Sequence, residues 1–282
     1  MNAAATIAQT LANAARALHV YSDSPRLDAE LLLGKVLGLS RSSLIAHDGR
    51  LLDARDESAY ADLIRQRARG VPVAYLTGCR EFWSLPLIVT PHVLVPRPET
   101  ESLVQHALQV MPPEAAVSVL DLGTGSGAIA LSLACERPCW DITAVDLSAP
   151  ALEVAMQNAA ALRLARIKWR LGNWFDAVPG ERFHLIVGNP PYIAEGDPVL
   201  ASLAAEPAMA LTAGPTGLDA LSIIIAQAPL HLHPRGWLVL EHGATQAPAV
   251  AELMSQHSFA SVRTYLDFSG KPRITLGTHT QH

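Results

Sequence analysis

Apolar residues recur at helical spacing through the first seventy residues of the chain. A helix with 3.6 residues per turn places such residues on one face. A first stripe is Ile7, Leu11, Ala14 and Leu18, and a second is Leu27, Leu31, Leu32 and Val36. A third helix is indicated by Tyr60, Leu63, Ile64 and Arg67. Ser24-Pro25 suits the start of the second helix, and Gly70 suits the end of the third. Residues 1–70 are therefore predicted to form a small helical domain.

The pattern changes between Gly70 and Pro98. Prolines at 72, 86, 91, 96 and 98 exclude a continuous helix. Alternation of apolar residues near Phe82, Leu85, Leu87 and Val89 indicates two short strands. Residues 71–98 are predicted to be a linker that contains a β-hairpin.

Strands and helices alternate from residue 99 to residue 282. Four short apolar runs, 117–120, 141–145, 183–187 and 236–240, read as strands, and helical patterns such as 148–162 follow them. This alternation predicts an α/β domain with a mostly parallel sheet and helices on both faces. The last two strands, near 262–266 and 274–276, have too short a connection for a parallel crossover, so the last strand is expected to be antiparallel.

Composition restricts the kinds of partner. Half of the 282 residues are hydrophobic, and 21 basic against 26 acidic residues give a formal net charge of −5. This balance does not favour binding of nucleic acid. No apolar stretch is long enough to span a membrane. Three cysteines and no signal-peptide pattern indicate reduced thiols in a cytoplasmic protein.

Neither the cysteines nor the histidines indicate a metal site. Cys135 and Cys139 are interpreted as buried small residues near a helix end, because no second ligand pair follows. His231 and His233 are interpreted as a polar helix end.

A glycine-rich turn, Asp121-Leu122-Gly123-Thr124-Gly125-Ser126-Gly127-Ala128, follows the first strand of the α/β domain. Glycine allows a tight turn and close approach of a ligand to the backbone. Asp146 ends the next strand, where an acid can accept ribose hydroxyls. The arrangement indicates a nucleotide cofactor, and on this motif alone NAD and S-adenosylmethionine both remain open.

The strand 183–187 runs into Gly188-Asn189-Pro190-Pro191-Tyr192. Ligands of open α/β sheets bind beyond the carboxyl ends of the strands, so this segment is expected to face the cofactor. The Asn189 side-chain oxygen and the Pro190 carbonyl can each accept one N–H of a planar amide or amine, and Tyr192 can stack on it.

These motifs resemble those of methyltransferases that act on planar nitrogen groups. The blocks 72–78, 81–83 and 95–101, with 24–33, 241–243 and 267–273, resemble the peptide chain release factor glutamine methyltransferase family. The resemblance spans nearly the whole chain. It implies a helical N-terminal domain that recognises the substrate, a β-hairpin and a seven-stranded Rossmann-like methyltransferase domain.

The resemblance also implies the reaction. Its cofactor is S-adenosyl-L-methionine, and its substrate is the glutamine of the Gly-Gly-Gln motif in class-one release factors. The cofactor site would comprise Gly123, Thr124, Gly125, Ser126, Gly127, Asp146, Trp174 and Asn189, and Asn189, Pro190, Pro191 and Tyr192 would hold the glutamine. Asn189, Pro190 and Tyr192 would serve catalysis.

Two positions depart from the family's usual pattern. Asn173 stands where many relatives carry an acid, and Ala204-Ala205 stand where relatives often have a basic and an aromatic residue. The alternative functions are a ribosomal-protein glutamine methyltransferase, an adenine-N6 DNA or RNA methyltransferase, a non-catalytic cofactor-binding scaffold and a dehydrogenase.

Overall fold

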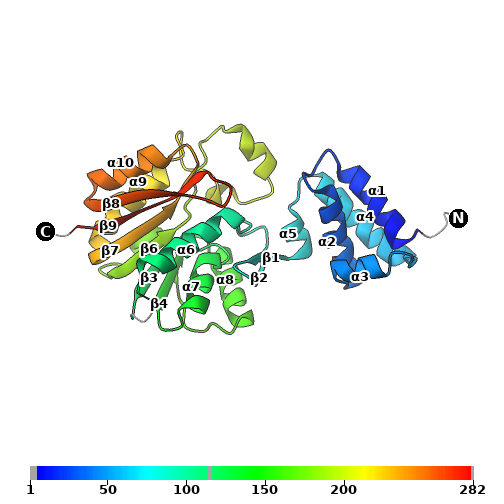
Figure 1. Cartoon of the computed structure of the whole chain (residues 1–282), viewed down its shortest axis with the longest axis horizontal. Helices are drawn as coiled ribbons and strands as arrows, with labels where there is room; N and C mark the ends of the chain where they lie inside the picture. The colour runs from blue at the N-terminus through cyan, green and yellow to red at the C-terminus, as the bar shows by residue number, and fades with distance from the viewer. Residues whose placement is uncertain (1–4, 113–115, 281–282) are drawn as a thin grey trace. The chain divides into compact units, whose positions relative to one another are not determined.

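The protein is described here by a computed structural model, which describes residues 5–112 and 116–280. The chain divides into two compact units (Figure 1). The first unit runs up to Cys79 and also includes Ser202–Ala205. The second unit contains Arg80–Ala201 and the residues from Glu206 onward.

The first unit is helical, as predicted. Its described helices are α1 (Ile7–Leu18), α2 (Pro25–Leu37), α3 (Arg41–Ala46), α4 (Ala54–Ala68) and α5 (Val73–Thr77). Helix α1 begins with a capping box in which Thr6 and Gln9 exchange hydrogen bonds. Its predicted stripe is buried, and Ile7, Leu11 and Ala14 of the stripe pack in one core with Leu32, Leu33 and Tyr60.

The stripe predicted for α2 is partly wrong. Leu27 and Leu31 are exposed, at 37% and 38%, whereas Asp28 and Glu30 are buried. The buried acids are neutralised by arginines: Asp28 pairs with Arg67 of α4 at 2.7 Å, and Glu30 pairs with Arg26 and Arg41. Buried charges require such partners. The inward face of α2 therefore carries two paired acids beside Ala29, Leu32 and Leu33.

The second unit begins with the predicted hairpin, β1 (Cys79–Phe82) and β2 (Leu85–Ile88). Its main sheet has seven strands in the order β5-β4-β3-β6-β7-β9-β8. They are β3 (Ser118–Leu122), β4 (Asp141–Asp146), β5 (Lys168–Leu171), β6 (Phe183–Gly188), β7 (Leu232–Glu241), β8 (Phe259–Leu266) and β9 (Pro272–His279). Strand β9 is antiparallel to both of its neighbours, which confirms the predicted antiparallel last strand.

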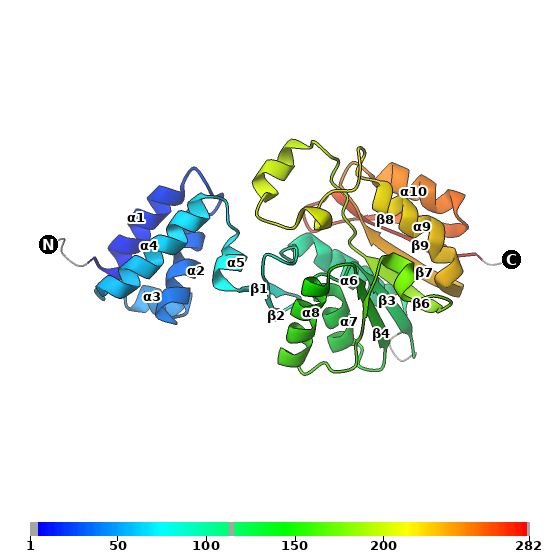
Figure 2. The same cartoon turned by 180° about the vertical axis from the view of Figure 1, so that it is seen from behind.

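Helices lie on both faces of this sheet (Figures 1 and 2). They are α6 (Glu101–Val110), α7 (Ala128–Glu136), α8 (Ala149–Ala161), α9 (Asp219–His231) and α10 (Ala247–Gln256), with short 3-10 turns at Pro98–Thr100, Trp174–Ala177, Pro198–Leu203 and Ala208–Ala210. Successive residues of β3 point to opposite faces. Val119 packs in the core beneath α6 and α7, and Leu120 packs in the core beneath α9 and α10.

The structure corrects two local predictions and adds one strand that was not predicted. Strand β5 was not predicted, because its four residues are polar or only partly buried. His233 lies in β7 and not at a helix end, since β7 begins at Leu232. Cys135 and Cys139 are exposed, so their interpretation as buried residues is wrong. Among the described residues, none of the helices is long and apolar enough to cross a membrane.

Candidate active site

The strand register places four functional candidates in one row at the edge of the sheet. Leu122 of β3 pairs with Val145 of β4 and with Gly188 of β6, and Gly188 pairs with Leu240 of β7. The next residues along these strands are Gly123, Asp146, Asn189 and Glu241. Because parallel strands end at the same edge, this edge is where an open α/β sheet binds its ligand.

The glycine turn after β3 requires glycine at three positions. Gly123, Gly125 and Gly127 have φ of 71°, 56° and 83°, a region that side chains other than glycine rarely adopt. A Cβ at Gly127 would lie 2.9 Å from Leu131 and 3.2 Å from Ala155. Gly127 therefore lets the start of α7 pack closely.

Asp146 holds this turn in place. Its Oδ2 accepts the Gly125 backbone N–H at 2.8 Å, and its Oδ1 accepts the Ser148 backbone N–H at 2.9 Å. Burial raises the pKa of Asp146, and the two N–H groups oppose that rise. The acid thus shapes the glycine turn as well as facing the space beyond it.

Asp121 supports the turn from below, a role that the sequence did not reveal. It is fully buried, and its Oδ2 accepts the Thr124 hydroxyl at 2.6 Å and the Ala130 backbone N–H at 3.2 Å. Burial raises the pKa of Asp121 to about 7.

A cavity lies over the row of strand ends. All of the predicted cofactor residues except Gly127 line this cavity, and so do Asn189 and Pro191 of the predicted substrate residues. The predicted residues that line it are Gly123, Thr124, Gly125, Ser126, Asp146, Trp174, Asn189 and Pro191. Pro190 and Tyr192 do not line it. The Trp174 ring covers Gly123, since a Cβ there would lie 3.3 Å from it.

Part of the cavity wall comes from a segment that follows the Asn-Pro-Pro-Tyr motif. Pro207, Met209 and Ala210 line the cavity together with Asp146 and Trp174. Glu206 attaches this segment, as its buried carboxylate accepts the Val95 backbone N–H at 3.0 Å and pairs with Arg97. Arg97 also lines the cavity.

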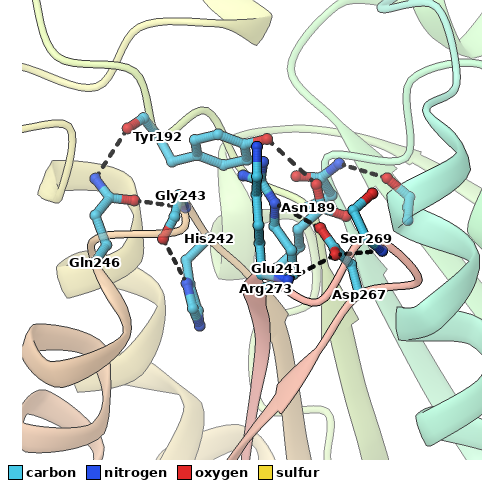
Figure 3. A network of polar contacts seen from close by, with 11 residues as sticks. Asn189, Tyr192, Glu241, His242, Gly243, Gln246, Asp267, Ser269 and Arg273 are labelled. Carbon is cyan, nitrogen blue, oxygen red and sulfur yellow. Dashed lines mark hydrogen bonds and ion pairs between the residues drawn. The ribbon is translucent and has the colours of Figure 1, made fainter.

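Asn189 and Tyr192 are held by a group of buried polar side chains (Figure 3). The Asn189 Nδ2 group donates to the Thr100 Oγ1 atom at 3.2 Å. The Tyr192 hydroxyl donates to Glu241 Oε1 at 3.3 Å. Neither Thr100 nor Glu241 was singled out as a site residue from the sequence.

Glu241 is 1% exposed, and burial raises its pKa to about 7. The Thr100 hydroxyl, the Arg273 guanidinium and the Tyr192 hydroxyl oppose that rise, while Glu99 adds to it. Arg273 is itself anchored by Asp267, 3.2 Å away. Burial also raises the pKa of Tyr192, so this phenol keeps its proton and serves as a donor.

Gln246 fixes the chain just after the motif (Figure 3). Its Nε2 group donates to the Tyr192 carbonyl at 3.0 Å, and its Oε1 accepts the Gly243 N–H at 2.8 Å. A Cβ at Gly217 would lie 2.2 Å from the same Tyr192 carbonyl. The backbone at Tyr192 is therefore closely confined.

The fold and this site define the class: the protein is a methyltransferase. Residues 100–217 match the methyltransferase small domain, and residues 9–78 match the PrmC N-terminal domain. A solved structure with this fold is the Thermus thermophilus 16S rRNA N2 G1207 methyltransferase in complex with AdoMet and guanosine. Its sequence is 18% identical to this one, and the two structures superpose with a TM-score of 0.55. The match covers 71% of this chain and 49% of that chain.

The particular family follows from curated relatives. A release factor glutamine methyltransferase of Xylella fastidiosa is 50% identical over 89% of this chain and 92% of its own length. One from Pseudomonas aeruginosa is 49% identical over 91% and 93%. The chain belongs to the release factor glutamine methyltransferase family.

Proposed function

We propose that the protein transfers a methyl group from S-adenosylmethionine to the side-chain amide nitrogen of the glutamine in the Gly-Gly-Gln motif of class-one release factors. One observation carries the proposal. In a chain of this family, Asn189 and Pro191 line the same cavity as the glycine turn and Asp146.

The residues around the cavity fit S-adenosylmethionine. The glycine turn offers backbone N–H groups and leaves room for the polar end of the cofactor. At Gly125, for example, a Cβ would meet no other atom within 4 Å. Asp146 is suited to its ribose hydroxyls, and Trp174 offers a flat apolar surface for its adenine. When bound, the cofactor supplies a methyl group on a positively charged sulfur.

The protein's task is to orient a poor nucleophile. The lone pair of an amide nitrogen is delocalised into its carbonyl group. The Asn189 side-chain oxygen and the Pro190 carbonyl would each accept one N–H of the glutamine, which directs the nitrogen toward the cofactor methyl. Correct alignment of the reacting atoms is worth several kcal/mol, about 7–11 in the best cases.

Tyr192 is proposed to cover the glutamine amide and exclude water. Its hydroxyl is bound to Glu241 and its carbonyl to Gln246, so the position of the ring is fixed from both ends. A fixed aromatic ring costs little entropy when a planar group stacks on it.

The helical region 1–70 is proposed to recognise the release factor, in the cytoplasm where translation ends. Its buried core leaves Leu27 and Leu31 of α2 exposed.

The direct test is methyl transfer from labelled S-adenosylmethionine to a purified release factor. The matched control is the same factor with its Gly-Gly-Gln glutamine changed to alanine. Label on the first and none on the second supports the proposal. No label on either, with cofactor binding intact, contradicts it and directs the search to ribosomal proteins and then to nucleic acids.

A further inference from the structure

A second cavity lies in the α/β unit, away from the carboxyl ends of the strands. Its volume is about 300 Å³, at the lower end of the range for small-molecule sites, roughly 300–1,000 Å³. Trp140, which directly precedes β4, and Ile167, which directly precedes β5, both line it. Because β4 and β5 are parallel, this cavity lies at their amino ends, whereas Asp146 and the cofactor cavity lie at the carboxyl end of β4.

The wall of the second cavity is basic. Arg137 lines it from the end of α7, and Arg163 and Arg166 line it from the connection between α8 and β5. No acid among the described residues lines it. Within residues 5–112 and 116–280, none of these three arginines forms an ion pair.

The acids that flank Arg137 in the sequence have other partners. Glu136 accepts the Trp83 indole N–H at 2.8 Å, and Asp141 pairs with Lys168 at 2.7 Å. Three positive charges therefore share one cavity, in a protein whose formal net charge is −5.

Two N–H groups of the same wall have no acceptor. Trp140 is 4% exposed, and its indole Nε1 is buried without a hydrogen-bond partner among the described residues, as is Arg137 Nε. The Arg137 Cζ atom lies 5.9 Å from the centre of the Trp140 ring, so the two side chains are neighbours. Indole and guanidinium groups donate hydrogen bonds and do not accept them. This part of the wall therefore favours a ligand that accepts.

Arg163 occupies an unfavourable backbone conformation. Its φ is 58°, and it directly follows Leu162, the last residue of α8, where glycine is the common choice. The chain thus accepts a conformational cost at the point where it places a guanidinium beside the cavity.

We propose that this cavity is a second binding site, for a small molecule that carries a phosphate monoester on an apolar body. At neutral pH such a phosphate has a charge of about −1.5 to −2 and three acceptor oxygens. It therefore matches three guanidinium groups better than the single charge of a carboxylate does. The apolar body is matched by the other lining residues, Trp140, Ile142, Leu164 and Ile167. The proposal does not depend on the proposed methyl transfer.

The test follows binding at this cavity by nuclear magnetic resonance of the full chain, with S-adenosylmethionine at saturation. The probe is phenyl phosphate, compared with phenol, which lacks the phosphate, and with inorganic phosphate, which lacks the ring. The indole N–H signals of the five tryptophans are observed, and Trp140→Phe and Trp174→Phe assign two of them. Trp140 reports on the second cavity and Trp174 on the cofactor cavity.

Phenyl phosphate is expected to shift the Trp140 signal with a dissociation constant of about 1 mM or lower, and to leave the Trp174 signal unchanged. Phenol and inorganic phosphate should each bind about tenfold more weakly or less. The proposal is overturned by an unchanged Trp140 signal, by a shift of Trp174 in its place, or by equally strong binding of phenol or of inorganic phosphate.

Charge-removing variants connect the binding to the arginines. Arg163→Gln and Arg166→Gln change exposed side chains, and each should weaken binding about tenfold, because each removes a hydrogen bond between charged groups. Arg170→Gln is the matched control, since Arg170 is exposed on β5 and does not line the cavity; its affinity should stay within about twofold. Unchanged affinity in Arg163→Gln and Arg166→Gln, or an equal loss in Arg170→Gln, would overturn the proposal.

Arg163→Gly separates binding from stability. Glycine adopts the observed φ without strain, so the melting temperature should not fall, whereas the affinity for phenyl phosphate should fall as in Arg163→Gln. Wild-type affinity in Arg163→Gly would show that the guanidinium plays no part in binding and would contradict the proposal.

Discussion

The Glu206 carboxylate accepts the backbone N–H of Val95 at 3.0 Å, although the two residues are 111 positions apart. This bond attaches the segment after the Asn-Pro-Pro-Tyr motif to the segment that follows the hairpin. Both segments line the cavity, through Pro207 and Met209 on one side and Val93 and Pro96 on the other. The bond therefore ties together two segments of the cavity wall.

Glu206→Ala is expected to weaken the cavity wall and the fold together. The Val95 N–H is left buried without an acceptor, and Arg97 loses its partner, which should lower the free energy of unfolding by about 1–3 kcal/mol. Chemical denaturation measures this change, and titration should show weaker binding of S-adenosylmethionine. Asp141→Ala, which removes the exposed pair with Lys168, is the control and should change stability by less than about 1 kcal/mol. Equal effects of Glu206→Ala and Asp141→Ala on stability and on cofactor binding would contradict the role of Glu206 in holding the cavity wall.

Asp146→Ala is expected to weaken cofactor binding. The change removes the acceptor that holds the Gly125 N–H at 2.8 Å, as well as the carboxylate proposed for the ribose. Hydrogen bonds to a charged group are worth about 1.5–3 kcal/mol, so the affinity should fall about ten- to hundredfold. Isothermal titration with S-adenosylmethionine measures it. Unchanged affinity would remove Asp146 from the site.

Asn189→Ala is expected to keep cofactor binding and lose most of the turnover, about a hundredfold in kcat. The Asn189 side chain lines the cavity with its amide group. Its removal is expected to leave the glycine turn, which holds the cofactor, intact. Kinetics with the release factor and a parallel cofactor titration measure the two effects separately. Turnover equal to the wild type would show that Asn189 does not hold the substrate amide.

Glu241→Gln is expected to change how stability depends on pH. The pKa of Glu241 is raised from 4.5 to about 7 in the folded protein, mainly by burial. Between these values the folded state keeps a proton that the unfolded state has lost, so this group lowers stability as pH rises from 4.5 to 7. Above pH 7 its effect is constant.

The Glu241→Gln variant has no titratable group at this position, so it lacks this pH dependence. Its stability relative to the wild type should therefore increase from pH 4.5 to 7, by up to about 3 kcal/mol, and then level off. Thermal or urea unfolding of both proteins across this range measures the difference. A difference that does not vary with pH would show that the pKa of Glu241 is the same in the folded and unfolded states.

The sequence predicted those parts of the protein that depend on neighbours along the chain. The glycine turn, Asp146 and Asn189 each follow a recognisable strand directly. Since parallel strands end at one edge, the strand ends alone bring these residues together. Trp174, which lines the same cavity, was predicted from the family resemblance and not from its place after a strand.

Contacts between distant segments could not be predicted in this way. Thr100 and Asn189 are 89 positions apart, and Tyr192 and Glu241 are 49 apart. Nothing in the local sequence of Thr100 shows that its hydroxyl meets Asn189. The pair of the buried Asp28 with Arg67 could not be predicted either, because it spans 39 positions.

The central claim is tested most directly by locating the methyl group on the product. The protein, S-adenosylmethionine and a release factor are incubated together, and the peptide that contains Gly-Gly-Gln is sequenced by tandem mass spectrometry. The account predicts one added methyl group on the glutamine side chain, absent when the Asn189→Ala variant replaces the wild type. A methyl group on another residue, or none while S-adenosylmethionine is bound, would contradict it.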